Sequence, residues 1–321
     1  MLLSPVILPL LIASTLCAQP SSPKPVPHMQ AVPLPRNQIS FQRDGVEITR
    51  YHYGPELTRP FLFPMNGPSG RSLTRMDHPH DPESHSHHNS FWLSHHDVGG
   101  VSTWGDGGRG RIVHQRIERL DDSENAASVL TLNKWTADTT NILLLEHRRI
   151  TVQWLPDDEW LLLLDMQLEA STREIVLGKT PFGITGVRMA KSIGVNDGGG
   201  TIRNSEGAVN EKEVFWKPAR WVDYSGPITA TATEGITLFD HPSNPNHPPA
   251  FHVRNDGWMG ASLTFDKPIT LQVGKPLALR YGLYVHEGLK TTNALQGQWK
   301  RFSETSPATF PAKVRAANAG K

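Results

Sequence analysis

The sequence has almost no cysteine and no excess of either charge. Its 321 residues include one cysteine, Cys17, so the chain can form no internal disulfide. Lys and Arg total 32 while Asp and Glu total 31, which gives a formal net charge of +1. Proteins that bind nucleic acid usually carry a basic face with a clear excess of Lys and Arg. We therefore expect no nucleic-acid partner.

Long apolar runs, long helices and common nucleotide-binding motifs are missing as well. Beyond the N-terminus no run approaches the roughly 18 apolar residues of a membrane-spanning helix, so we expect no membrane span. The sequence has no P-loop, no Gly-x-Ser-x-Gly and no His-Glu-x-x-His. The glycine-rich segment 105–110 has no helical pattern behind it that could receive a phosphate. We also find no long amphipathic helix.

The N-terminus has the composition of an export signal. Residues 6–16 are apolar, and a small-residue cleavage pattern ends at Ala18. We expect a signal peptide over residues 1–18 and a Pro-rich flexible lead-in over 19–36. The mature protein would then be exported, to the periplasm or the extracellular space. The alternative is a buried N-terminal strand, which the prolines in this segment disfavour.

From residue 37 onward the sequence alternates in short strand-like runs. Asp44-Gly45 between two such runs predicts a β-hairpin. Gly (27) and Pro (26) are frequent, as expected when many strands are joined by turns. We predict an all-β fold, a large antiparallel β-sandwich, in a single domain over residues 37–303 with a polar tail over 304–321. The longest strand-like runs are residues 111–120, 127–135, 142–154, 160–168 and 277–285.

Histidine and acidic residues concentrate in one stretch, residues 76–104, which holds seven of the fifteen histidines. Such side chains bind transition metals and transfer protons near neutral pH. If His85-Ser86-His87 lies on a strand, both imidazoles point the same way and could hold a divalent metal such as Zn, Cu, Fe, Mn or Ca. The candidates for a third ligand are His95, Asp97, His286 and Glu287. The alternative is a solvated polar loop.

Three further segments are rich in polar and aromatic residues. His286-Glu287 ends a strong strand and offers an acid and a base together. Residues 239–254 place His252 and Arg254 on one face of a strand. Residues 216–226 contain tryptophans, whose flat faces stack on sugar rings, beside charged side chains that bind hydroxyl groups. Each segment also has a purely structural interpretation, as a strand end or a core tryptophan with surface charges.

Residues 84–104, Ser-His-Ser-His-His-Asn-Ser-Phe-Trp-Leu-Ser-His-His-Asp-Val-Gly-Gly-Val-Ser-Thr-Trp, resemble the signature of the PmoA-like family. Supporting matches include Phe182-Gly183-Ile184, segment 221–226 and Asp240-His241-Pro242. The resemblance implies an exported sugar-processing β-sandwich, a supersandwich of the galactose-mutarotase-like kind. The chain departs from the family pattern at Ser84, Ser86, Asn89, His96 and Gly99. Asp77-His78-Pro79-His80 repeats the start of the signature, so His80 is an alternative to His87 as the functional histidine.

Three functions fit these observations. The first is a carbohydrate-active hydrolase, lyase or epimerase that acts on a sugar or oxidised sugar by His/carboxylate acid–base chemistry. The second is a metal-dependent oxidoreductase or oxygenase, and the third is a non-catalytic glycan-binding module. We prefer the first and expect its residues to converge on one concave face. The expected catalytic residues are His88, His95, Asp97, His252, His286 and Glu287; the expected carbohydrate-binding residues are Trp92, Trp104, Lys179, Arg188, Trp221, Asp223, Asn244 and Arg254; the expected metal ligands are His85 and His87.

Overall fold

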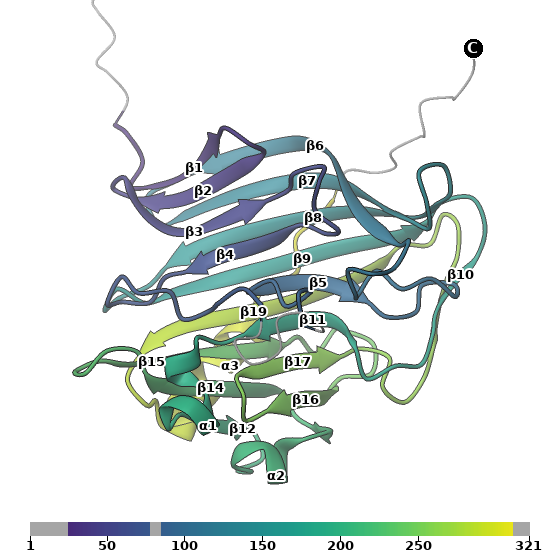
Figure 1. Cartoon of the computed structure of the whole chain (residues 1–321). Helices are drawn as coiled ribbons and strands as arrows, with labels where there is room; N and C mark the ends of the chain where they lie inside the picture. Colours follow the sequence, from purple (N-terminus) through teal and green to yellow (C-terminus); the bar gives the residue numbers. More distant parts are fainter. Residues whose placement is uncertain (1–24, 78–84, 311–321) are drawn as a thin grey trace, which may run out of the picture.

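The structure, a computed structural model, describes residues 25–77 and 85–310 of the chain (Figure 1). Two large sheets, of nine and eight strands, pack against each other, and a two-stranded sheet completes the fold. The paired strands in both large sheets run antiparallel. The predicted all-β fold, a large antiparallel β-sandwich, is confirmed.

The nine-stranded sheet has the order β1-β2-β3-β4-β5-β11-β17-β16-β13. Strand β5 pairs with β11, which brings the histidine-rich segment next to strands from the second half of the chain. The strands of this sheet are β1 (Met29–Leu34), β2 (Gln38–Arg43), β3 (Val46–His52), β4 (Phe61–Met65), β5 (Phe91–His95), β11 (Gly183–Arg188), β17 (Trp258–Ser262), β16 (Ala250–Arg254) and β13 (Lys217–Pro218).

The eight-stranded sheet has the order β12-β14-β15-β19-β9-β8-β7-β6. It contains the long strand-like runs that the sequence shows between residues 111 and 168, together with the last strong strand of the chain. Its strands are β12 (Thr201–Asn204), β14 (Trp221–Pro227), β15 (Thr233–Asp240), β19 (Leu277–Glu287), β9 (Trp160–Ala170), β8 (Ile142–Trp154), β7 (Ala126–Thr136) and β6 (Arg111–Asp122).

The other elements are short, apart from one helix. Strands β10 and β18 pair with each other. None of the helices within the described ranges has the length and apolar composition to cross a membrane. These elements are β10 (Ile175–Leu177), β18 (Ile269–Leu271), a 3₁₀ turn (Lys191–Ile193), α1 (Val195–Gly198), α2 (Asn210–Val214) and α3 (Thr292–Glu304).

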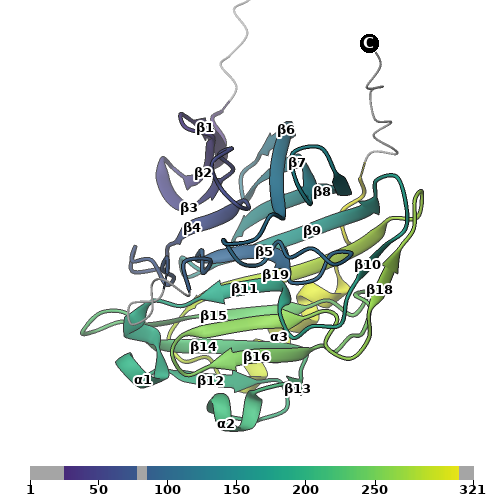
Figure 2. The same cartoon turned by 45° about the vertical axis from the view of Figure 1, so that its right-hand side comes forward.

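Helix α3 shows that the expectation of no long amphipathic helix was wrong. It has 13 residues, and Leu295, Trp299 and Phe302 recur at helical spacing on one face. The Thr291 hydroxyl caps its start by accepting a hydrogen bond from the Ala294 N–H at 3.2 Å. The helix lies behind β19 and β15 in both views (Figures 1 and 2). Its apolar face covers the outer side of the eight-stranded sheet.

Strand β1 lies inside the segment that we expected to be a flexible lead-in. It pairs with β2 along its whole length, and Met29 and Ala31 are buried in the core. The Asp44-Gly45 hairpin that joins β2 to β3 is as predicted, with positive φ at both turn residues. The predicted signal peptide, residues 1–18, lies outside the described residues, as does the tail from residue 311.

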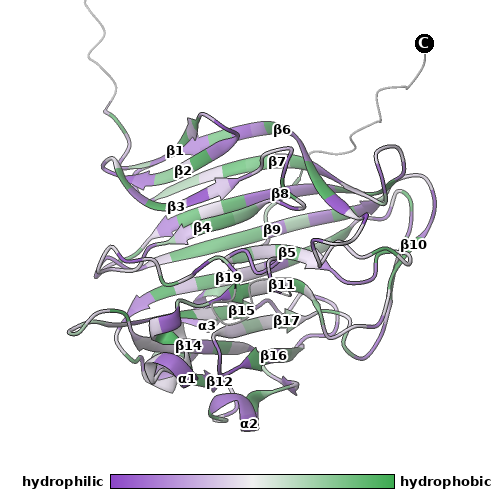
Figure 3. Cartoon of the chain, viewed as in Figure 1, coloured by the Kyte–Doolittle hydropathy of each residue, from purple (hydrophilic) through white to green (hydrophobic). Residues whose placement is uncertain are grey.

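The core lies between the two sheets and leaves each sheet an outer face. In β5, Phe91 and Leu93 belong to the core, whereas Trp92 belongs to a separate aromatic cluster on the other side, as the two-residue period of a strand requires. In β16, Phe251 and Val253 belong to the core in the same way. Figure 3 shows that β9 is hydrophobic over much of its length, and it lies near the centre of the sandwich.

Two glycines make room for aromatic rings on the outer face of the nine-stranded sheet. Gly186 in β11 lies opposite Trp92 in β5. A Cβ at Gly186 would lie 2.6 Å from the Trp258 ring and 2.9 Å from the Trp92 ring. A Cβ at Gly260 would lie 3.1 Å from the Trp258 ring and 2.5 Å from the Thr185 carbonyl oxygen. The rings therefore rest directly on the backbone of β11 and β17, where any side chain would displace them.

We expect Gly186→Ala to lower the free energy of unfolding by about 1–3 kcal/mol, because the added methyl group overpacks the two indole rings. The matched control is Gly297→Ala in α3, where the new Cβ meets nothing closer than 4.0 Å. That change should stabilise the chain by about 0.5–1 kcal/mol, since Gly is a poor helix former. Urea unfolding of both variants measures the difference, and a Gly186→Ala variant as stable as the parent chain contradicts the packing described.

Candidate functional site

An open cavity of about 710 Å³ lies on the outer face of the nine-stranded sheet. Three parts of the chain that are distant in sequence line it. The turn at 85–88 and the loop at 102–107 form one side, and the ends of β11, β16 and β17 form the other. The lining residues are His85, Ser86, His87, His88, His96, Ser102, Trp104, Gly105, Asp106, Gly107, Phe182, Arg188, His252, Arg254, Asp256 and Trp258.

Stacked aromatic rings form the floor of the cavity. The His88 imidazole lies nearly parallel to the Trp258 ring, with 5.0 Å between centroids and 14° between planes. It also stacks on Trp92 at 5.4 Å, and Trp104 packs on both tryptophans. His88 is only 7% exposed. Trp92 lies beneath this layer and does not line the cavity, so it supports the site from below.

The segment that carries His85 and His87 is a turn, where the metal hypothesis assumed a strand. The His88 N–H donates to the His85 carbonyl at 3.0 Å, and the three imidazoles gather with centroids 4.5–6.0 Å apart. Both His85 and His87 line the cavity nevertheless. Across residues 25–77 and 85–310, no three His, Cys, Asp or Glu side chains are placed to hold a metal ion. His78 and His80 lie outside the described residues.

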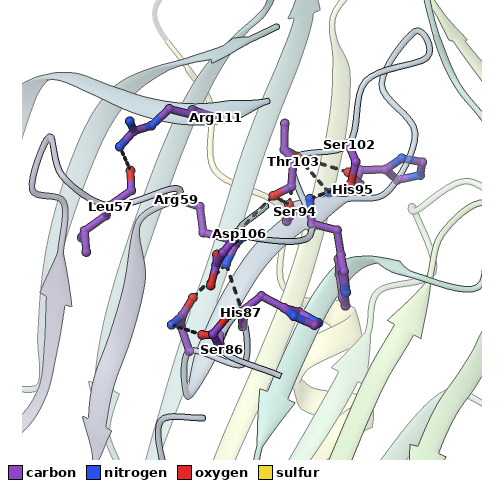
Figure 4. Close-up of polar contacts among 12 residues, drawn as sticks. Leu57, Arg59, Ser86, His87, Ser94, His95, Ser102, Thr103, Asp106 and Arg111 are labelled. Atoms are coloured by element: carbon purple, nitrogen blue, oxygen red, sulfur yellow. Dashed lines mark hydrogen bonds and ion pairs between the residues drawn. The ribbon is translucent and has the colours of Figure 1, made fainter. Parts of the chain in front are cut away.

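Arg59 ties together the two loops that form one wall of the cavity (Figure 4). Its side chain is buried, and its Nε donates to the Thr103 carbonyl at 3.1 Å. Nη1 donates to the Asn89 side chain at 2.8 Å and to the His87 carbonyl at 3.3 Å. Nη2 pairs with Asp106 at 2.8 Å. One guanidinium therefore fixes both His87 and Asp106 at the cavity.

His252 is held in a single tautomer. The Trp258 indole N–H, which can only donate, points at His252 Nδ1 at 2.8 Å. Nδ1 is thus the acceptor, and the proton of the neutral ring sits on Nε2. Burial lowers the pKa of His252 to about 4, with a smaller contribution from Arg254. At neutral pH this side chain can donate a hydrogen bond through Nε2.

Arg188 and Arg254 bring positive charge to the cavity. Arg188 ends β11, is fully buried, and donates from Nη1 to Asp256 at 2.9 Å. Arg254 ends β16, and its Nε lies 3.3 Å from Glu211. The Arg254 side chain is 51% exposed at the mouth of the cavity.

His95 and Asp97 do not line the cavity. The Asp97 N–H donates to His95 Nδ1 at 3.1 Å, so Nε2 donates to the Thr264 hydroxyl at 2.8 Å. That hydroxyl donates in turn to the Gly178 carbonyl at 2.8 Å. Burial lowers the pKa of His95 to about 4. The Asp97 carboxylate accepts the Gly100 N–H in a turn. Both residues therefore stabilise the loop after β5.

The structure places the other expected site residues away from the cavity. Trp221, Asp223 and His286 are buried in the eight-stranded sheet, on the outer face beside α3. His286 Nε2 lies 2.9 Å from Asp223. Burial alone would raise the pKa of Asp223, but hydrogen bonds from His286 and Arg203 lower it overall. This hydrogen-bonded pair lies on the opposite outer face of the sandwich, away from the cavity.

The last three expected residues are also outside the cavity. The Asn244 side chain binds Asp240 and the backbone of Arg280, which closes a loop. Lys179 and Glu287 are exposed. The predicted convergence of the histidine stretch with residues 252–254 is therefore present, and that with residues 286–287 is absent.

Several residues of the cavity were missed from the sequence. Asp106 is the one acidic residue of the glycine-rich loop 105–110, a composition that could have drawn attention to it. Arg59, which supports the wall from behind, stands two residues before the apolar run that starts at Phe61, and a charge in that place can signal a buried, paired group. Phe182, Asp256 and Trp258 had no local signal, because their role depends on the pairing of distant strands.

Comparison with known proteins gives a family and three distant structures. The model of a family of unknown function, DUF6807, matches residues 38–300. This finding corrects the assignment to the PmoA-like family, since the matching family model does not carry that name. No curated protein matches the chain.

Three solved structures resemble the chain at low sequence identity. A candidate kojibiose phosphorylase from the human microbiome has 10% identity and a TM-score of 0.37, over 88% of this chain and 37% of its own. A GalM/aldose epimerase homologue from C. elegans has 6% identity and a TM-score of 0.30, and the match covers 81% of this chain and 99% of the homologue. A polysaccharide lyase has 8% identity and a TM-score of 0.31, and the match covers 81% of this chain and 32% of the lyase. The chain thus spans about a third of the length of two of them, and these scores assign it no activity.

We expect Arg59→Gln to lower the free energy of unfolding by at least about 2 kcal/mol, because it leaves several buried partners unsatisfied. The matched control is Arg111→Gln. Arg111 also donates to carbonyls of the 55–57 segment (Figure 4), but from a partly exposed position, so its loss should cost under about 1 kcal/mol. Thermal unfolding compares the two, and equal losses contradict the role given to Arg59.

We expect stability to fall as the pH drops from about 6.5 to about 4. The unfolded His95 takes up a proton at its ordinary pKa near 6.5, whereas the folded ring resists protonation down to about 4. The stability that the neutral His95 ring contributes is therefore fully present above about pH 6.5. Over this window His95 contributes about 3 kcal/mol of the loss. In His95→Gln the drop in unfolding free energy between pH 7 and pH 4 should shrink by that amount, and parallel curves for the two chains contradict the assignment.

Proposed function

Because the chain belongs to DUF6807, a family of unknown function, we propose its activity from the cavity alone: it is a carbohydrate-active enzyme that uses histidine acid–base chemistry. The observation that carries this proposal is the convergence of five histidines, two arginines and two aspartates from distant segments in one cavity over an aromatic floor. Proton-transferring groups, hydrogen-bond donors and apolar ring faces are what a polyhydroxylated substrate requires.

His87 is the proposed general acid or base. It is half-buried at the cavity wall, and its backbone carbonyl accepts a hydrogen bond from Arg59. Its ring packs at the edges of Trp92 and Trp104. Asp106, bound by the other arm of the same guanidinium, is a carboxylate held in the same wall. A histidine held in this way can transfer a proton near neutral pH.

His252 has a complementary role. Its Nε2–H is locked in place by the Trp258 indole, and its low pKa keeps it uncharged at neutral pH. Such a donor stabilises negative charge that develops on a substrate oxygen without itself titrating in the working pH range. The acid–base step is thereby separated from the stabilising hydrogen bond.

Trp216 supplies a flat surface beside the cavity. Its indole is 43% exposed and stacks on Phe215 at 4.4 Å, with its centroid 6.3 Å from that of His252. The large rings of the floor are nearly covered, whereas Trp216 keeps a face available to solvent. We assign it the role of stacking on a sugar ring next to the reacting unit.

A second candidate is a glycan-binding module without catalysis. It is favoured by the burial of two expected catalytic histidines, His88 at 7% and His95 at 0% exposure. The cavity would then hold a sugar by its rings and arginines alone. Turnover separates the two functions.

The test is turnover of a panel of neutral and acidic mono- and oligosaccharides, followed by proton NMR, which detects hydrolysis, elimination and epimerisation alike. On any substrate found, His87→Gln should lower kcat by about 10²- to 10⁴-fold with little change in KM. Trp216→Ala should raise KM by about tenfold and leave kcat intact. The control is His28→Gln, which removes exposed pairs with Asp44 and Glu124 and should change neither.

Two outcomes contradict the proposal. Full kcat in His87→Gln removes the acid–base assignment. Binding of a sugar with no turnover anywhere on the panel favours the glycan-binding module instead.

A further inference from the structure

Arg188 has hydrogen-bonding capacity that the described part of the chain does not use. Nη1 donates to Asp256, but Nε and Nη2 are buried and have no hydrogen-bond partner among residues 25–77 and 85–310. Leaving a buried donor unpaired costs about 1–3 kcal/mol, and more for a charged group. An unpaired pair of donors on a residue that lines a cavity therefore points to a ligand.

The two unused nitrogens form one edge of the guanidinium. Nε–H and Nη2–H point the same way, in the parallel arrangement that binds both oxygens of a carboxylate. We call this Nε/Nη2 edge the fork. Its plane is fixed, because Asp256 holds Nη1. The backbone is fixed as well, since the Arg188 N–H donates to the Ser90 carbonyl at 2.7 Å. The edge is thus presented by a rigid strand end rather than by a loop.

Arg188 keeps its positive charge in this environment. Burial lowers its pKa, and the adjacent Asp256 opposes that shift, so the guanidinium remains charged at neutral pH. Arg254 adds a second cation at the mouth of the same cavity. The carboxylate of Asp106 is already bound by Arg59 and does not compete for Arg188.

We propose that the cavity takes an acidic sugar and that Arg188 binds its carboxylate through the Nε/Nη2 edge. This inference rests on the proposed carbohydrate function and narrows its substrate class to uronic acids and their oligomers. Arg254 attracts the same charge from the mouth of the cavity, where it acts as a point charge and not as a fork. Neutral sugars would leave the buried donors of Arg188 unpaired, and the site would reject them for that reason.

The experiment uses sugar pairs that differ only at C6: glucose and glucuronate, galactose and galacturonate, mannose and mannuronate, each as monomer and trimer. Binding to the full chain is measured by NMR titration, with acetate as a carboxylate without a sugar. The acidic member of at least one pair should bind at least tenfold tighter than its neutral partner. Arg188→Lys keeps the charge but loses the fork, and should reduce that ratio at least tenfold.

The controls distinguish binding of the carboxylate by the Nε/Nη2 edge of Arg188 from general electrostatic attraction. Arg254→Gln should weaken binding of the acidic sugar by a smaller factor, which depends on the salt concentration. Arg109→Gln removes an exposed cation of the neighbouring hollow and should change nothing. Thermal unfolding shows whether Arg188→Lys remains folded, and Arg188→Gln serves as the second variant if it does not.

Each outcome decides a claim. Equal binding of acidic and neutral sugars overturns the acidic-substrate inference and leaves the carbohydrate function standing. Retention of the preference in both Arg188 variants overturns the role of Arg188. Arg188-dependent binding of acetate with no binding of any sugar retains the carboxylate subsite and contradicts the carbohydrate function. No binding by any of these probes contradicts both.

Discussion

The two-residue alternation of side chains along β5, β11, β17 and β16 is the constraint on which the candidate site depends. It places Trp92, Gly186, Trp258 and His252 on one outer face while the intervening residues fill the core. The rings rest on the sheet because glycines stand where side chains would collide with them. A slip of one residue in any of these pairings would turn the aromatic floor into the core.

On that floor the polar groups are held by donors and acceptors with little freedom. Arg59 fixes the wall that carries His87 and Asp106, and the Trp258 indole fixes the tautomer of His252. In the function that we propose, His87 moves protons, while His252 stays neutral and donates a hydrogen bond. These different roles of the two histidines follow from their hydrogen-bond partners and burial. The number of histidines in the sequence would not reveal them.

The sequence allowed the class of fold and half of the site to be predicted. Alternating runs and the Asp44-Gly45 turn predicted antiparallel strands, and the histidine stretch with His252 and Arg254 does meet in one cavity. His286 and Asp223 were expected there too. Local pattern shows that a residue ends a strand, but strand order decides which outer face it occupies, and β14 and β19 belong to the other sheet. Helix α3 was missed although Leu295, Trp299 and Phe302 carry its apolar face, because its remaining positions are polar.

We propose that the outer face of the nine-stranded sheet binds sugar through this cavity. A crystal structure of the chain soaked with a uronate trimer tests it most directly. We expect a sugar ring beside Trp216 and His252, with a carboxylate on the Nε/Nη2 edge of Arg188. A sugar bound on the opposite face, near Asp223 and His286, with the cavity empty, would contradict it.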